Sequence, residues 1–160
     1  MKILTELEQI ASLAEETVRR HDSRNPFEIA QGEGIRVQSC PDFKNLKGMY
    51  KVILGERFVF LNGNMTRREA AEVLAHELGH DALHREMGEN SIVQDEFILD
   101  MTLKPEYQAN LFAANLLYED GEIRSLLRQG YNAQEIARKM RGSVPFVELK
   151  ILTLEKLGKL

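Results

Sequence analysis

Cysteine and long apolar runs are nearly absent from this chain of 160 residues. Cys40 is the single cysteine, and because it cannot form an internal disulfide, the sequence predicts a protein of the reducing cytoplasm. Cys40 can in principle bind a metal ion as a thiolate, and a passive loop position is the alternative. No stretch of 18 apolar residues occurs, so no membrane partner is expected. Residues 1–6 lack the apolar core of a signal peptide, so export is not expected either.

An excess of positive charge is also missing. The net charge is −4, and residues 1–120 carry 13 Lys and Arg against 21 Asp and Glu, whereas residues 121–160 carry 8 against 4. This distribution is far from the basic signature of a nucleic-acid-binding domain, so direct DNA binding is not expected. The length predicts one domain, residues 1–120, with a small C-terminal helical segment, residues 121–160, packed on it.

The most informative feature is the motif HELGH at residues 76–80. In a helix, His76 and His80 project from one face, and Glu77 flanks that face. This is the arrangement of a hydrolytic zinc site, with two imidazole ligands and a glutamate that acts as general base. The alternative is a pair of ordinary helix-face histidines. Three of the chain's four histidines, the third being His84, lie within nine residues, which favours the metal site.

Local signals bound the helix that carries this motif. Thr66 and Glu69 form the pattern of a capping box at its start, and Gly88 is the expected stop. On a helical wheel the three histidines lie roughly opposite the apolar stripe that includes Leu74 and Leu78. We therefore expect one face of this helix to pack on the core and the other to form the floor of a cleft.

The upstream residues predict two helices and a small sheet. Apolar spacing indicates a helix over residues 2–20, and Asn25 with Pro26 begins a short helix over residues 27–31. Strands are expected at residues 35–37, 49–54 and 57–61. The last two form a hairpin. We expect a small antiparallel sheet that packs on the HELGH helix and whose edge strand can pair with an extended peptide.

A catalytic zinc takes three protein ligands, so His76 and His80 need one more donor. Glu106 follows His80 by 26 residues and opens a helix that Pro105 initiates. Asn110, one turn later, can accept a hydrogen bond from the far nitrogen of a ligating histidine and so fix its orientation. The alternative for Glu106 is a favourable charge at a helix N-terminus.

Other side chains are candidates for further roles. Asp95, Glu96 and Asp100 can act as carboxylate ligands, and a solvated loop with a short helix is the commoner outcome for such a run. An oxyanion donor is also expected, and its candidates are His84, Tyr107, Tyr131 and Tyr50. His84 can otherwise contact substrate, help to position a ligand, or line the cleft without binding metal.

The paired motifs resemble those of the ImmA/IrrE metallopeptidase family. Residues 76–84 read HELGHDALH and residues 106–117 read EYQANLFAANLL, where the family carries HELGHxxLH followed by ExxAN-x-FAA-xx-L. The likeness covers roughly residues 25–118. Two such motifs in order are far more specific than a single HExxH.

The resemblance implies a small α+β, zincin-like metallopeptidase. It implies one Zn²⁺ per chain bound by His76, His80 and Glu106, with Glu77 as the general base. It also implies a protein substrate, because members of this family typically cleave or otherwise inactivate a helix-turn-helix repressor, which switches on mobile-element, prophage or stress-response genes. The alternatives are a non-proteolytic anti-repressor and a DNA-binding regulator with a zinc site. An open fourth coordination position and Glu77 argue against a purely structural zinc.

Three short helices are expected in the C-terminal segment. Asp120 is expected to cap the first, Asn132 and Glu135 form a second capping box, and the last covers residues 145–157. Their order resembles a helix-turn-helix. The charges of the last helix alternate in sign, which favours packing or protein docking over DNA binding, because phosphate contact needs clustered positive charge.

Overall fold

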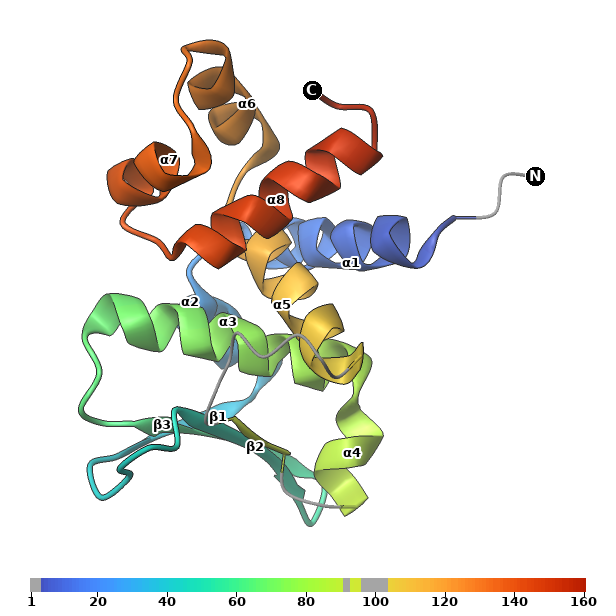
Figure 1. The fold of residues 1–160 in the computed structure, drawn as a ribbon. Coiled ribbons are helices and arrows are strands. Elements are labelled where there is room, and N and C mark those ends of the chain that lie inside the picture. The colour runs from blue at the N-terminus through green and yellow to red at the C-terminus, as the bar shows by residue number, and fades with distance from the viewer. Residues whose placement is uncertain (1–3, 91–92, 96–103) are drawn as a thin grey trace.

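The computed structural model describes residues 4–90, 93–95 and 104–160 (Figure 1). In order along the chain, its elements are α1 (Glu6–His21), α2 (Pro26–Glu33), β1 (Arg36–Cys40), β2 (Gly48–Ile53), β3 (Glu56–Asn62), α3 (Arg67–Leu83), α4 (Arg85–Asn90), β4 (Val93–Asp95), α5 (Lys104–Leu117), α6 (Asp120–Arg128), α7 (Ala133–Met140) and α8 (Val144–Lys156). The prediction of an α+β fold is confirmed.

Hydrogen-bonding side chains decide where the helices begin. The capping box predicted at Thr66 and Glu69 is confirmed, with Glu69 N donating to Thr66 Oγ1 over 3.2 Å. The first helix begins at Glu6 and not near residue 2, because Thr5 and Glu8 form a capping box that the sequence prediction overlooked. Asn25 caps α2 as predicted, and its Oδ1 accepts from Phe27 N over 3.0 Å.

The sheet is mixed, which corrects the prediction of an antiparallel one. Its strand order is β1-β3-β2-β4, and β1 runs parallel to β3. The hairpin prediction is confirmed, since β2 pairs with β3 antiparallel through a turn at Leu54 and Gly55, both with positive φ. The hairpin places β3 between β1 and β2, and the chain reverses twice between β1 and β3, so these two strands run in the same direction. The edges of the sheet are therefore β1 and β4.

Helix α3 lies between the sheet and α5 (Figure 1). The nine residues from Val73 to Asp81 are all buried, so both faces of the helix are covered, whereas the sequence predicted one face toward the core and one toward a cleft. The helix ends at Leu83 and not at Gly88, because His84 leaves helical geometry with φ −134° and ψ 35°. The chain bends there into α4, where Gly88 packs on the ring of Tyr50.

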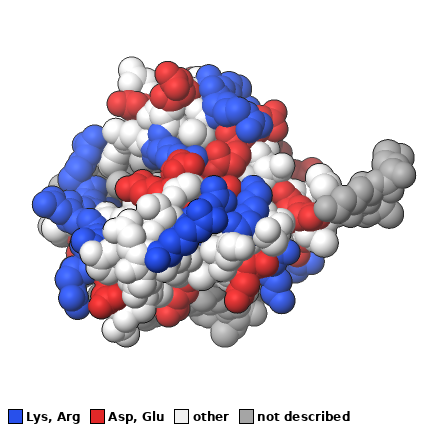
Figure 2. All heavy atoms as spheres, turned by 90° about the horizontal axis from the view of Figure 1, so that it is seen from above, with Lys and Arg blue, Asp and Glu red and all other residues white. Residues whose placement is uncertain are grey.

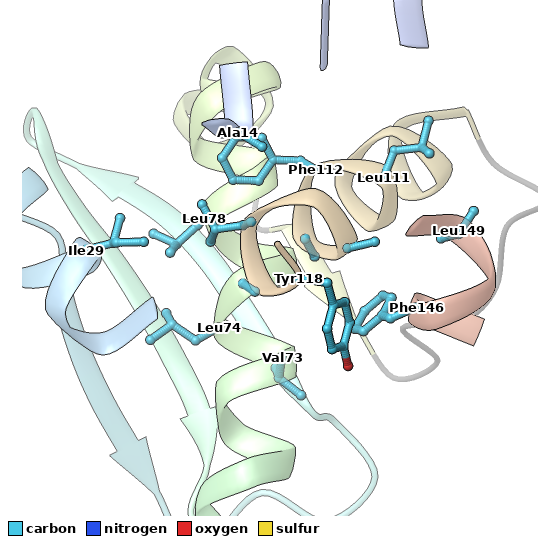
Figure 3. Close-up of a cluster of buried hydrophobic side chains, with 14 of the residues drawn as sticks. Ala14, Ile29, Val73, Leu74, Leu78, Leu111, Phe112, Tyr118, Phe146 and Leu149 are labelled. Atoms are coloured by element: carbon cyan, nitrogen blue, oxygen red, sulfur yellow. The ribbon is translucent and has the colours of Figure 1, made fainter. Parts of the chain in front are cut away.

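The hydrophobic core joins these layers. Figure 3 shows Leu74 and Leu78 of α3 beside Ile29 of α2, and Phe146 of α8 beside Tyr118. All five side chains are at most 5% exposed. The core is therefore continuous from the helices that cover the sheet to the C-terminal helix.

The C-terminal helices pack on the rest of the chain through α8. In a helix-turn-helix, the helix after the turn would present its face to DNA, but α8 is directed into the core. Its buried residues are Phe146, Val147, Leu149, Lys150, Thr153 and Leu154. Ser143 N at its start donates to Glu72 Oε1 of α3 over 2.8 Å. This burial favours the packing role that the alternating charges predicted.

The surface over the C-terminal helices carries charges of both signs. Figure 2 shows Lys and Arg interspersed with Asp and Glu on this face, without one large basic patch. Within the described ranges, no helix is both long and apolar enough to cross a lipid bilayer.

A buried lysine connects α8 to two other elements. The Lys150 side chain is 1% exposed, and its Nζ donates to Asp120 Oδ1 and, over 3.1 Å, to Asn115 Oδ1 of α5. The prediction that Asp120 caps α6 is wrong, because the N-cap is Glu119, whose carboxylate accepts from Gly121 N over 2.9 Å and from Glu122 N over 2.8 Å. Asp120 pairs with Lys150 instead. Burying an ammonium group is costly unless it is paired.

Lys150→Met is expected to destabilise the fold by about 2–3 kcal/mol. Removing one member of a buried ion pair costs about 3–5 kcal/mol, and the loss is reduced here because Asp120 is 23% exposed and keeps Lys159 as a partner. Urea unfolding measures the change. The matched control is Lys156→Met, an exposed lysine of the same helix; equal losses in the two variants would contradict the prediction.

Candidate metal centre

Three predicted ligands come together at the crossing of α3 and α5. His76 and His80 lie one turn apart on α3, and Glu106 lies in the first turn of α5. One donor atom from each lies within 4.8 Å of the other two, and among the described residues this is the group that can hold a metal ion. The two imidazoles are fully buried, and the Glu106 side chain is 14% exposed.

The distances within this group suit a tetrahedral ion. His76 Nε2 lies 3.0 Å from Glu106 Oε2, His80 Nε2 lies 3.2 Å from Glu106 Oε1, and the two Nε2 atoms are 3.1 Å apart. In a tetrahedral zinc site with bonds of about 2.0–2.1 Å, neighbouring ligand atoms lie about 3.3–3.4 Å apart. The three donors are therefore spaced to hold a tetrahedral ion such as zinc with small adjustments, and they would leave its fourth position open.

Asn110 defines which nitrogen of His76 faces this group. Asn110 Oδ1 lies 2.7 Å from His76 Nδ1, and both side chains are fully buried. A carbonyl oxygen only accepts, so His76 Nδ1 carries the proton and donates. Nε2 of the neutral ring then presents its lone pair toward Glu106. This is the contact that the sequence predicted for Asn110.

Glu77 lies beside the first residue of β2. Glu77 is fully buried, and a Cβ built on Gly48 would lie 2.8 Å from Glu77 Oε1 and 2.7 Å from Val73 Cγ1. Glycine at position 48 thus lets the strand approach α3 closely. The carboxylate of the predicted general base occupies the narrow space between the helix and the sheet.

A glycine also permits the close crossing of α3 and α5. A Cβ on Gly79 would lie 2.9 Å from the Cα and the carbonyl oxygen of Ala109, nearer than a real Cβ approaches another atom. Ala109 contributes a small side chain to this contact. Gly79 supplies the other half of the contact, and the crossing brings Glu106 to the histidines.

Gly79→Ala is expected to destabilise the protein by about 1–3 kcal/mol, because the methyl group would press on the backbone of α5. Helix propensity alone predicts the opposite sign, a gain of roughly 0.8–1 kcal/mol. Chemical denaturation of the metal-free variant measures the difference. A stabilised variant would show that the two helices are not in tight contact.

His84 contacts another histidine. Its Nδ1 lies 3.0 Å from His80 Nδ1, and its Nε2 lies 2.7 Å from Gln108 Oε1. Burial lowers the pKa of His84, although the hydrogen bond to Gln108 acts in the opposite direction. The neutral form of this imidazole is therefore favoured near pH 7.

The tyrosines named as oxyanion donors have different surroundings. Tyr50 is fully buried and donates to Asp81 Oδ1 over 2.6 Å. Burial and that hydrogen bond both raise the pKa of Tyr50, so its hydroxyl stays protonated. Tyr107 packs partly buried against the core beside Glu106. Tyr131 lies in the C-terminal helical segment, with Lys139 Nζ 4.5 Å from its ring centroid.

Sequence reasoning missed Asp81, which follows the candidate ligand His80. Asp81 is 6% exposed, and besides the Tyr50 hydroxyl it accepts from Arg57 Nη1 over 2.9 Å. These bonds connect α3 to β2 and β3 and so support the helix that carries the histidines. No local pattern signals this role, since the two partners are 31 and 24 residues away in the chain.

Cys40 is not part of the group that can hold a metal ion. Cys40 ends β1 and its Sγ lies 3.9 Å from the carbonyl oxygen of Gln38. Asp95 is the last residue of β4. Glu96 and Asp100 lie outside the described residues.

Comparison with known proteins identifies one family and two relatives. A sequence model of the IrrE N-terminal-like domain, in the M78 peptidase family, matches residues 30–152. The chain is 27% identical over 128 residues to an uncharacterised immunity region protein 2 of Bacillus phage phi105, covering 80% of each sequence. It is 28% identical over 128 residues to the metallopeptidase ImmA of Bacillus subtilis strain 168, covering 75% of this chain and 70% of ImmA.

Proposed function

Because this chain belongs to the M78 peptidase family of IrrE N-terminal-like domains, we propose that it is a zinc-dependent endopeptidase. One Zn²⁺ per chain would be held by His76, His80 and Glu106. The observation that supports this proposal best is the approach of the three donor atoms to within 4.8 Å of one another, on two helices in tight contact. Three protein ligands leave a position open, as a catalytic zinc site requires.

The side chains around the ion would have separate roles in peptide hydrolysis. When bound, zinc supplies Lewis-acid polarisation of the peptide carbonyl and makes water acidic enough to react near pH 7. Glu77 accepts the proton of the attacking water at its carboxylate and passes it to the leaving nitrogen. Asn110 holds the His76 imidazole with Nδ1 protonated, so that Nε2 stays a metal donor.

We propose that the substrate is a helix-turn-helix repressor. One relative is an immunity region protein of a phage, and another is the metallopeptidase ImmA. The resemblance of the two motifs to those of the ImmA/IrrE family implies a helix-turn-helix repressor as substrate. The charge of residues 1–120, with 13 Lys and Arg against 21 Asp and Glu, would attract a basic DNA-binding protein. The reaction would then take place in the cytoplasm, where a repressor binds its operator.

The test is incubation of the zinc-loaded protein with the repressor-like protein encoded beside its gene. Mass spectrometry identifies any cut, and a sample treated with a chelator is the control. We expect one specific cut that is absent after chelation. Stable binding without a cut would favour a non-proteolytic anti-repressor and would contradict the proposed hydrolysis.

A further inference from the structure

We propose that His84, Gln108 and Glu6 form a directed hydrogen-bond chain that positions the imidazole of His80. His84 and Gln108 are then positioning residues of the metal site, and the chain ends on the N-terminal helix α1. The proposal rests on the metal site proposed above. Among the roles that the sequence left open for His84, the proposal selects the positioning of a ligand and sets aside the oxyanion and substrate contacts.

Each residue of the hydrogen-bond chain contacts the next. His80 Nδ1 lies 3.0 Å from His84 Nδ1, and His84 Nε2 lies 2.7 Å from Gln108 Oε1. Gln108 Nε2 then donates to Glu6 Oε1. Three elements contribute, because the histidines belong to α3 and its C-terminal cap, Gln108 to α5 and Glu6 to the first turn of α1.

The metal determines the direction of these bonds. His80 Nε2 faces Glu106 and His76 Nε2, and as a zinc ligand it carries no proton. The neutral ring then has its proton on Nδ1 and donates to His84 Nδ1. His84 must therefore carry its own proton on Nε2, where the carbonyl oxygen of Gln108 accepts it. The amide group of Gln108 is left facing the Glu6 carboxylate, which only accepts, so each link pairs one donor with one acceptor.

The two histidine ligands are thus supported in equivalent ways. Asn110 accepts from Nδ1 of His76, and His84 accepts from Nδ1 of His80. An acceptor on the far nitrogen orients the ring and increases its basicity as a ligand. The end of α3 makes this contact possible, because the non-helical backbone of His84 places its ring centroid 5.2 Å from that of His80, with the rings tilted by 53°.

The hydrogen-bond chain that supports His80 includes a residue outside the segment that matches the family model. Glu6 lies outside the matched residues 30–152, and it also forms an ion pair with Lys104, Nζ to Oε1 3.5 Å, at the start of α5. Glu6 of α1 therefore contacts two residues near the start of α5, Lys104 and Gln108. Loss of the contact between Glu6 and Gln108 is expected to make the orientation of the His80 ring less fixed.

Two variants of His84 separate the hydrogen bond from packing. In His84→Asn the side-chain Oδ1 takes the position of Nδ1 and can still accept from His80, whereas His84→Leu fills similar space without an acceptor. We expect His84→Leu to weaken zinc binding by about 10–100-fold and His84→Asn to retain most of the affinity. Competition with a chromophoric chelator measures the Kd, and circular dichroism checks the fold.

Glu6 is tested by a matched pair on α1. Glu6→Ala removes the last residue of the hydrogen-bond chain. Glu16→Ala removes an exposed glutamate of the same helix that is not part of the hydrogen-bond chain. We expect weaker zinc binding in Glu6→Ala alone, with a smaller loss than in His84→Leu because the Glu6 side chain is 52% exposed. Equal Kd values for the two alanine variants would contradict the part assigned to α1.

The protonation pattern is a second readout. In the zinc-loaded wild-type protein, nitrogen NMR should find the proton on Nδ1 of His80 and on Nε2 of His84. A proton on Nδ1 of His84, or equal zinc affinity in His84→Leu and the wild type, would overturn the inference while leaving the metal site intact. An equal loss in His84→Asn and His84→Leu would also overturn it, since packing alone would explain both. Failure of the wild type to bind zinc would instead refute the proposed metal site itself.

Discussion

Glu77→Gln is expected to lower the rate of peptide cleavage by about 10²–10⁴-fold while zinc remains bound. The amide has the shape of the carboxylate, so the close packing against Gly48 is kept. It cannot take a proton from water, and the general-base step is lost. Zinc affinity should change little, because the three proposed ligands are His76, His80 and Glu106.

The experiment compares cleavage of the repressor substrate with the zinc content of the purified protein. Glu86→Gln is the matched control, since it makes the same chemical change at an exposed position of α4. Full activity in Glu77→Gln would remove this residue from the mechanism. Loss of zinc together with activity would show that the variant disturbs the metal site and would contradict the separation of roles.

Glu106→Ala is expected to lose zinc. It removes one of three ligands, so its effect on affinity should exceed the roughly 10–100-fold loss that follows from removing a residue that only supports a ligand. Zinc at 100 times its Kd stabilises a folded protein by about 2.7 kcal/mol. The wild-type protein should therefore unfold at higher temperature when zinc is added, and the variant should not.

The same experiment tests the simpler role of Glu106 as a favourable charge at the start of α5. A charge in that position contributes about 0.3–1 kcal/mol, with or without metal. Under that reading the variant would lose a little stability and would still respond to zinc. An unchanged zinc-dependent shift in melting temperature would thus reject Glu106 as a ligand.

The local features of the fold were predictable from sequence. The capping boxes at Thr66 and Asn132 and the hairpin between β2 and β3 depend on residues close together in the chain. The approach of His76 to His80 is of the same kind, because any helix brings residues four apart onto one face. The zincin-like character of the fold and the roles of the site residues remain predictions.

Contacts between distant segments needed the tertiary structure. Alternation of apolar residues identifies a strand but not its neighbour, so the parallel pairing of β1 with β3 was missed. The end of α3 at Leu83 was also missed, because Gly88 resembles a helix stop in sequence while its actual environment is the ring of Tyr50.

The candidate ligands and the family could be identified from the sequence, because both depend on residue types at fixed short spacings. The contacts that support the candidate ligands could be found only in the folded protein. Asp81 meets Tyr50 and Arg57 across 31 and 24 residues, and Gln108 meets Glu6 across 102. Such pairs leave no periodic signal in the chain, since they arise only when packing of the core brings helices and strands to their final positions.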